Sequence, residues 1–355
     1  MPCDSPLQHS AQIAVTFWVK LLGHTVGRVD ASGKMQVTVG QSGGCSAMDE
    51  VGPVGPDGVG HLAFPRVTFL GGRSAFSALS LRALLEAGVR VARVLVSPME
   101  DGSGAVGAVA SSFSAIPLRQ PDPLDEVVRN AGLVEPEPVL LAAGQVQLAA
   151  SADDVAVCAC FGARLSEASL AGFHNGVLNI HPSLLPAYRG PAPLYWQYRD
   201  GCSRFGVSVH RMVSALDAGP ILAQADLVVG PRMGGLMVEQ QLAAMGGELT
   251  ARLLTRPIPR GSPQDEALAT YQTWPDERHY RISPLWTAER AFRFMQGTAH
   301  HGVAFKVQIL AEQFRLERVL DFDANVKLPR PYVRDGRRIE IAMRPGVLTA
   351  RLSGS

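Results

Sequence analysis

The chain has 355 residues, of which 46% are hydrophobic and 18% are charged, a composition that excludes a wholly disordered protein and leaves room for two domains. The formal net charge of +1 excludes a global electrostatic attraction to nucleic acid or to acidic membranes. No apolar run approaches the roughly 18 residues of a membrane span, and no charged region precedes an apolar core at the start, so we expect a cytoplasmic protein without a signal peptide.

The first part of the chain differs in composition from the remainder. Gly and Pro are frequent there, and the apolar residues keep no lasting period. We therefore predict a disordered or loosely attached extension over residues 1–64, within which Met48 is an alternative start.

An alternation of strands and helices occupies residues 65–256. The apolar run at 67–70 predicts a buried strand, helical spacing predicts a helix that stops at Gly88, and 89–98 predicts the next strand. The other elements expected here are helices over 122–132, 166–173 and 233–254 and strands over 153–161, 176–180, 205–212 and 221–229. Strand–helix–strand order is typical of a Rossmann-like α/β domain with a parallel sheet, although the stretch FLGGRSAF lacks the GxGxxG dinucleotide fingerprint.

The C-terminal part has another pattern. Residues 257–269 have the composition of a linker. One helical stretch at 287–297 precedes three strand-like runs, which predict a small β-rich, barrel-like domain over 270–355. From Ala251 onward the chain has 17 Lys and Arg against 11 Asp and Glu, so this basic part contacts either an anionic ligand or only solvent.

The cysteines and the paired histidines predict no metal or disulfide site. The five cysteines are an odd number without a CxxC pair, and Cys158 and Cys160 lie in one apolar run, so we expect small buried side chains on one strand face in a reducing compartment. The adjacent His300 and His301 lack the spacing of metal ligands and are expected at the surface. No GxSxG, GxxxxGK[ST] or HExxH motif is present, and no metal is expected.

The stretch GVLNIHPSLLPAYRGPAP, residues 176–193, joins an apolar strand to a proline-rich loop. Because side chains alternate along a strand, Asn179 and His181 share one face. Both lie at the carboxyl end of the predicted strand, where open α/β sheets bind ligands, and the prolines restrict the loop after it. This pattern predicts two hydrogen-bonding groups in one cleft. His210, at the period of an inward-facing residue, is expected to be structural.

The string NIHPSLLPAYRGPAP, with Asp217 of SALDAGPILAQ 36 residues after His181, resembles the folate-dependent formyltransferases. This family includes methionyl-tRNA formyltransferase, glycinamide ribonucleotide formyltransferase and the sugar N-formyltransferases. The stretch VTFLGGRSAFS resembles the family's opening strand and turn, and CACFGARLS resembles its strand toward the folate pocket. The similarity covers residues 66–255 and continues more faintly over 270–352.

The resemblance implies transfer of a formyl group from N10-formyltetrahydrofolate to an amine. Such an attack produces a negative oxygen, which Asn179 would stabilise; His181 would be donor and proton carrier, and Asp217 would orient it or act through water. The residues expected around the folate are Phe161, Gly162, Ala163, Arg164, Leu165 and Leu216. The loop residues expected to contact the acceptor or the cofactor are Ser183, Tyr188, Arg189 and Gly190.

The acceptor is open to more than one interpretation. Methionyl-tRNA formyltransferase has the most similar whole-chain architecture, but its basic loop after the second strand corresponds here to residues 99–113, which contain no Lys or Arg. We therefore favour a small-molecule amine, such as an amino sugar or a specialised-pathway amine, over initiator tRNA. Hydrolysis of formyltetrahydrofolate is a further alternative, although residues 1–64 do not resemble the regulatory domain of those enzymes. The intact Asn179, His181 and Asp217 set disfavours a binding protein without turnover, and the oligomeric state stays open.

Overall fold

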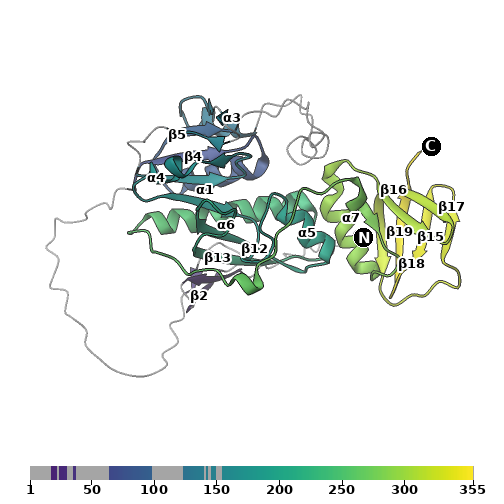
Figure 1. Cartoon of the computed structure of the whole chain (residues 1–355). Coiled ribbons are helices and arrows are strands. Elements are labelled where there is room, and N and C mark those ends of the chain that lie inside the picture. Colours follow the sequence, from purple (N-terminus) through teal and green to yellow (C-terminus); the bar gives the residue numbers. More distant parts are fainter. Residues whose placement is uncertain are drawn as a thin grey trace, which may run out of the picture.

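The computed structural model shows an α/β part followed by a C-terminal β part, which lie end to end (Figure 1). The loop at 99–113 and most of the extension predicted over 1–64 lie outside the described residues. The structure describes residues 17–21, 24–29, 35–36, 64–97, 123–139, 141–142, 145–148 and 154–354.

The α/β part is built on a ten-stranded sheet in the order β3-β2-β1-β13-β12-β11-β9-β4-β5-β6. The strands from β11 to β6 run parallel, whereas β12 and β13 are antiparallel to their neighbours. The strands β1 to β3 belong to the N-terminal stretch without a lasting period, and β1 pairs with β13. The bounds are β1 Phe17–Leu21, β2 His24–Val29, β3 Met35–Gln36, β4 Val67–Gly71, β5 Val91–Val96, β6 Glu137–Pro138, β9 Val155–Ala159, β11 Val177–His181, β12 Arg204–Arg211 and β13 Ile221–Val228.

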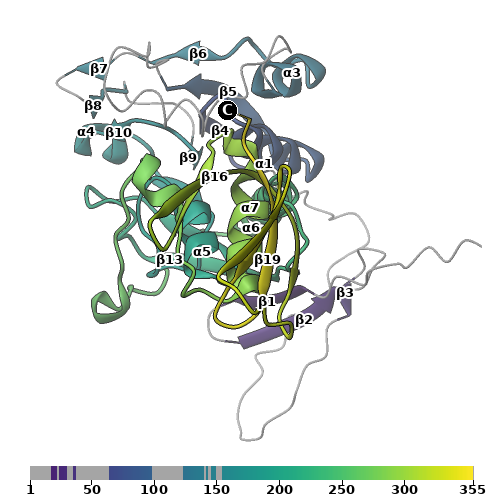
Figure 2. The ribbon, with the colours of Figure 1, turned by 90° about the vertical axis from the view of Figure 1, so that its right-hand side faces the viewer.

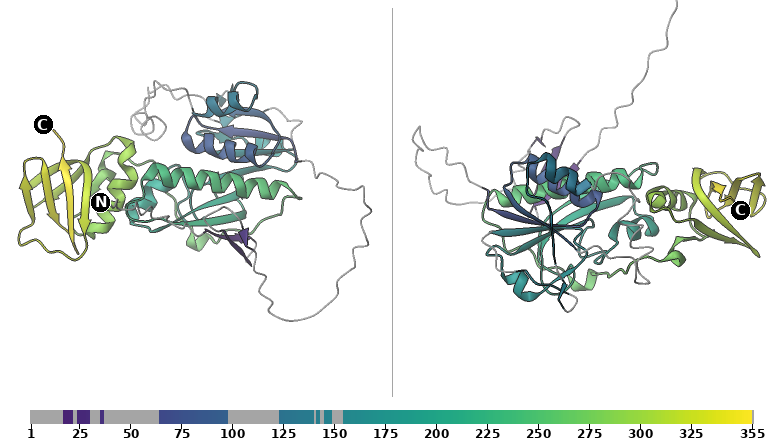
Figure 3. Two further views of the ribbon diagram at one scale, coloured as in Figure 1. Left: turned by 180° about the vertical axis from the view of Figure 1, so that it is seen from behind. Right: turned by 90° about the horizontal axis from the view of Figure 1, so that it is seen from above.

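Two helices, α1 (Ala75–Glu86) and α6 (Gly235–Leu254), lie side by side against the sheet (Figure 3). The Ser74 side chain caps α1 by accepting a hydrogen bond from the N–H of Ser77. A Cβ at Gly246 would lie 2.3 Å from Ile180 Cγ2, so the missing side chain lets α6 approach β11 closely. The predicted α/β class with a largely parallel sheet is confirmed.

Shorter elements surround this core. They are α3 Pro123–Asn130, α4 Glu167–Ala171, α5 Pro193–Asp200 and a small sheet of β7 Leu141–Ala142, β8 Gln145–Val146 and β10 Arg164–Leu165. The pattern did not predict α5, because its first residue, Pro193, closes a run read as a rigid loop. A proline is tolerated there, since the first turn of a helix needs no N–H donor.

The described C-terminal part has one α-helix, α7 (Ala288–Thr298), packed against a six-stranded sheet in the order β14-β15-β16-β19-β18-β17. Two short 3-10 helices, Glu277–Tyr280 and Ala299–His301, accompany it. Figure 2 shows this sheet in front of the α/β part. The predicted β-rich character is confirmed, whereas no pairing among the described strands joins the edges β14 and β17 into a barrel. The bounds are β14 Arg281–Ile282, β15 Phe305–Ile309, β16 Glu312–Asp323, β17 Tyr332–Asp335, β18 Arg338–Ala342 and β19 Val347–Leu352.

Aromatic side chains join the two parts. Tyr195 of α5 contacts Phe294 of α7 and Tyr280 at ring-centroid distances of 5.6 and 5.2 Å. His301 stacks on Tyr195 and bonds through Nδ1 to the Tyr280 hydroxyl at 2.8 Å. His301 is only 8% exposed, so its prediction as a surface residue is wrong. Burial lowers the pKa of His301 to about 2, which keeps the ring neutral and lets Nδ1 accept a hydrogen bond from the Tyr280 hydroxyl.

The two neighbouring cysteines differ in environment. Cys158 is buried on β9, whereas Cys160 follows the end of that strand with a φ of 50° and is exposed. The prediction of one shared buried face is therefore wrong for Cys160, because the strand ends before it. Of the helices within the described ranges, none combines the length and apolar character needed to cross a membrane.

Candidate active site

The site begins at the carboxyl end of β11, where this strand pairs with β12. Asn179 lies opposite His210, and His181 lies opposite Ser208. Asn179 Nδ2 is 3.1 Å from His210 Nε2. The alternation of β11 therefore brings Asn179 and His181 to one face, and the register of β12 adds a third polar side chain to it.

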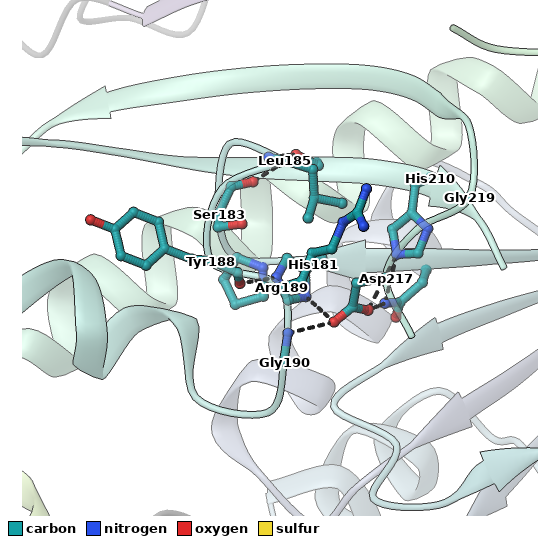
Figure 4. Close-up of polar contacts among 12 residues, drawn as sticks. His181, Ser183, Leu185, Tyr188, Arg189, Gly190, His210, Asp217 and Gly219 are labelled. Atoms are coloured by element: carbon teal, nitrogen blue, oxygen red, sulfur yellow. Dashed lines mark hydrogen bonds and ion pairs between the residues drawn. The ribbon is translucent and has the colours of Figure 1, made fainter. Parts of the chain in front are cut away.

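Asp217 reaches the same place from the turn between β12 and β13 (Figure 4). Its Oδ2 accepts a hydrogen bond from the N–H of Gly190 at 2.8 Å and lies 3.7 Å from His181 Nδ1. Its Oδ1 lies 3.4 Å from Asn179 Nδ2 and 3.6 Å from His210 Nε2. The amide, the two imidazoles and the carboxylate thus meet around one point.

The hydrogen-bond partners of His181 determine which of its ring nitrogens carries a proton. Nε2 lies 2.9 Å from the carbonyl oxygen of Tyr188, and a carbonyl can only accept, so Nε2 carries a proton. The atom that gains or loses a proton is then Nδ1, which faces the Asp217 carboxylate. His181 is 5% exposed and Asp217 is 8% exposed, so this pair is largely removed from water.

Burial and charge act against each other in this pair. Burial lowers the pKa of His181, while the charge of Asp217 and the Tyr188 carbonyl oppose that shift only in part. Burial alone would raise the pKa of Asp217. The attraction of His181 and the hydrogen bond from Gly190 oppose this effect, and the pKa of Asp217 lies well below its ordinary value. Asp217 is therefore a carboxylate, and His181 can exchange a proton beside it.

His210 holds Asn179 in place. Its Nδ1 lies 3.1 Å from the carbonyl oxygen of Arg211, so Nδ1 is the donor and Nε2 is free to accept from Asn179 Nδ2. Asn179 thus directs its two N–H groups to His210 and Asp217. The period had placed His210 facing inward, but only the register of β12 on β11 shows that it lies in the site.

The segment expected to contact folate starts just after β9. Phe161 and Ala163 are half-buried, Gly162 and Arg164 are exposed, and Leu165 is buried. Within the part of the chain that the structure describes, the main chains of Gly162 and Ala163 make no hydrogen bond. Across the site, Leu216 is 42% exposed beside Asp217. This region therefore offers polar main-chain groups and apolar surface to a ligand.

Most polar side chains of the loop expected to contact the acceptor form hydrogen bonds within the protein. The Ser183 hydroxyl donates to the carbonyl of Ala187 at 2.7 Å. The Tyr188 hydroxyl donates to Asp200 at 3.1 Å. Arg189 has no exposed surface. The structure thus places the Ser183 and Arg189 side chains inside the protein, while the Gly190 N–H reaches Asp217.

The segment over residues 257–276, here called the connector, runs back along the site. Ser262 pairs with Ile221, and Tyr271 pairs with Arg189. Gln264 donates from Nε2 to the carbonyl oxygens of Asp217 and Gly219, each at 2.7 Å. The composition of residues 257–269 is that of a linker, so the sequence did not predict that this segment contacts the site. No sequence pattern indicated a role for Gln264.

Comparison with known proteins shows which family matches this part of the chain. Residues 66–253 match the family described as formyl transferase, and Asn179, His181 and Asp217 lie within that match. A methionyl-tRNA formyltransferase of Synechococcus sp. (strain JA-3-3Ab) is 40% identical over 148 residues, which are 41% of this chain and 44% of that protein. One of Lactobacillus delbrueckii subsp. bulgaricus is 30% identical over 267 residues, 74% of this chain and 81% of that protein. The chain thus spans less than half of the first relative and most of the second.

Solved structures share the fold at low sequence identity. The N-formyltransferase of Helicobacter canadensis, in complex with folinic acid and dTDP-3-aminofucose, has a TM-score of 0.55 and 13% identity, covering 80% of this chain and 98% of that chain. WlaRD, a sugar 3N-formyl transferase, has a TM-score of 0.56 and 12% identity, covering 81% and 98%. The family match covers more than half of the residues and includes the whole polar cluster. The chain belongs to the formyl transferase family of enzymes.

Proposed function

We propose that this enzyme transfers the formyl group of N10-formyltetrahydrofolate to a primary amine, with Asn179, His181 and Asp217 at the reaction centre. The convergence of the Asn179 amide, the His181 imidazole and the Asp217 carboxylate, all within the family match, carries this proposal. No metal is part of it.

The transfer needs a donor for the formyl oxygen. Attack of the amine on the formyl carbon forms the new C–N bond and places negative charge on that oxygen. A fixed donor such as an Asn179 N–H stabilises it by about 3 kcal/mol. Both N–H groups of Asn179 already face His210 and Asp217, so the formyl oxygen replaces one of these two acceptors during the reaction.

The transfer also moves protons. The attacking amine loses a proton as the C–N bond forms, and the folate nitrogen gains one as its bond to the formyl carbon breaks. Nδ1 of His181 is the atom able to take the first proton and return the second, since Nε2 stays bonded to Tyr188. The Asp217 carboxylate, 3.7 Å away, stabilises the imidazolium between these two steps.

In the proposed complex, the folate binds beside Phe161, Gly162, Ala163, Arg164, Leu165 and Leu216. The available main-chain groups of Gly162 and Ala163 match the hydrogen-bonding edge of a pteridine, and Phe161 and Leu216 supply apolar surface. These features support a binding site between the end of β9 and the turn of Asp217.

Charged initiator tRNA is the acceptor that the relatives favour, in place of the small amine that the sequence pattern favoured. A protein named methionyl-tRNA formyltransferase matches 74% of this chain. Phosphate contacts need exposed cations. Within the described residues, seven exposed cations of the C-terminal part form no ion pair: Arg281, Arg315, Arg318, Lys327, Arg330, Arg334 and Arg344.

A small-molecule amine is the second candidate. The absence of Lys and Arg from residues 99–113 of the sequence favours it, since a basic loop at that place would attract tRNA. The likeness to sugar formyltransferases concerns the fold alone and supports neither acceptor over the other.

One assay separates these acceptors. The purified enzyme is mixed with N10-formyltetrahydrofolate and either methionylated initiator tRNA, an amino sugar nucleotide or no amine, and folate release is followed. We expect rapid release only with the tRNA. Release only with the sugar selects the second candidate, release without amine indicates a hydrolase, and no release in any mixture contradicts the proposed function. His181→Ala is expected to be inactive, with His174→Ala, at an exposed site, as the matched control.

A further inference from the structure

Both the nitrogen and the oxygen of the Gln264 side-chain amide form hydrogen bonds. Its Nε2 donates to the carbonyl oxygens of Asp217 and Gly219. Its Oε1 accepts from Arg189, at 3.1 Å from Nε and 2.8 Å from Nη2. Every hydrogen-bonding group of this side chain is therefore used, and it links the turn of Asp217 to Arg189.

Arg189 is a buried anchor for this link. A guanidinium has five N–H groups, and those of Arg189 make five hydrogen bonds: two to Gln264, two to Glu266 and one to the hydroxyl of Tyr271. All three partners belong to the connector. The Arg189 side chain, which was expected to contact the acceptor or the cofactor, holds the connector against the site.

These contacts close a ring around Asp217. The carboxylate accepts from the N–H of Gly190, and the carbonyls of Asp217 and Gly219 accept from Gln264. Gln264 is in turn bonded to Arg189, the residue before Gly190. Asp217 has a φ of 50°, in the left-handed region that a residue other than glycine adopts only when its surroundings hold it. Gln264 supplies two of the bonds that hold it.

We propose that Gln264 is a positioning residue, which fixes the turn of Asp217 so that the carboxylate stays beside Nδ1 of His181. This inference rests on the role of Asp217 in the proposed function. It extends the active site to a segment whose composition is that of a linker.

The test compares Gln264→Ala and Gln264→Glu with the wild-type enzyme, using folate release with whichever acceptor supports turnover. The glutamate still accepts from Arg189 but has no N–H for the carbonyls of Asp217 and Gly219. Both variants are expected to lower kcat about 10- to 100-fold with a small change in KM, as loss of a supporting side chain does. Gln308→Ala, at an exposed position of β15, is the matched control and is expected to keep wild-type kcat.

A second arm asks whether Gln264 acts through Asp217. In an Asp217→Asn background, Gln264→Ala is expected to lower kcat less than about 3-fold, because residues that act as one unit are not additive. An equal loss in both backgrounds, or wild-type kcat for Gln264→Glu, overturns the inference. Full activity of Asp217→Asn itself overturns the proposed role of Asp217, and the inference with it. Full activity of the Gln264 variants beside an impaired Asp217→Asn overturns the inference alone.

Discussion

The N–H of Gly190 donates to Oδ2 of Asp217 at 2.8 Å. This bond joins the loop after β11 to the turn before β13, and the same carboxylate oxygen lies 3.7 Å from Nδ1 of His181. The path of the main chain at Gly190 therefore decides where the carboxylate lies relative to the imidazole.

Gly190→Ala is expected to impair both folding and activity. Gly190 has a φ of 115°, and an added Cβ would lie 2.1 Å from the carbonyl oxygen of Gln272. The loop must move away from the connector, which removes the N–H from Asp217. We expect a loss of about 2–4 kcal/mol in the free energy of unfolding, measured by denaturant titration, together with a lower kcat. Gly230→Ala, in open space, is the control, and a stable, active Gly190→Ala would contradict the arrangement.

Asp217→Asn is expected to lower the pKa of His181 further. Burial already places this pKa below 6.5, and the negative charge of Asp217 opposes the shift. Without that charge the imidazolium is less stable, so His181 loses its proton at a lower pH. The ring resonances of His181, followed by NMR during a pH titration, measure this change directly. An unchanged or higher pKa in the variant would show that the two groups are not coupled.

The same coupling sets the pH dependence of the wild-type reaction. Nδ1 must be unprotonated to accept the proton of the amine, so kcat/KM is expected to fall as the pH falls through the pKa of His181, below 6.5. Asp217 stays a carboxylate over this range because its pKa is well below the ordinary value. An acid limb centred above pH 6.5 would contradict the assignment of His181 as the base.

Local periodicity was enough to predict the elements that carry two of the site residues. Alternation along β11 places Asn179 and His181 on one face, and this depends only on neighbouring residues. Asp217 was identified through the family's motif, because its place depends on a turn rather than on a period. The role of His210 depends on the register between β11 and β12, which one strand's sequence does not contain.

Other features were missed because long-range contacts stabilise them. β16 (Glu312–Asp323) lies between β15 and β19, but its outward face is charged, so its sequence lacks a continuous apolar run. The connector has no period of its own and is held by Arg189, which lies 75 residues before Gln264. Composition alone cannot distinguish such a segment from a free linker.

Glu239→Gln is expected to stabilise the protein at alkaline pH. Burial raises the pKa of Glu239 from 4.5 to about 7, although the N–H of Phe76 donates to the side chain. The folded state therefore holds a proton that the unfolded state releases, and stability falls as the pH rises from 4.5 to 7. Glutamine has no such penalty and keeps an acceptor for Phe76. We expect a gain of about 1–3 kcal/mol above pH 7 and little change below pH 4.5, since one pKa unit corresponds to about 1.4 kcal/mol.

Denaturant unfolding at two pH values measures this gain. Glu248→Gln, at an exposed position of the same helix, is the matched control and is expected to change stability by less than about 0.5 kcal/mol. A gain for Glu239→Gln that is the same at both pH values would argue against a buried titrating carboxyl.

Phe294→Ala is expected to destabilise the two parts of the chain together. Phe294 is fully buried on α7, with ring centroids 5.6 Å from Tyr195 of α5 and 5.5 Å from Phe305 of β15. Its removal leaves a cavity between the α/β part and the C-terminal sheet, which lowers the free energy of unfolding by about 3–5 kcal/mol. Because the same ring supports both sides, we expect one cooperative transition at a lower temperature in calorimetry. Leu310→Ala, 78% exposed, should leave that transition in place. A separate early transition for the C-terminal part alone would mean that the α/β part, with Asn179, His181 and Asp217, is stable without the aromatic contact to α7.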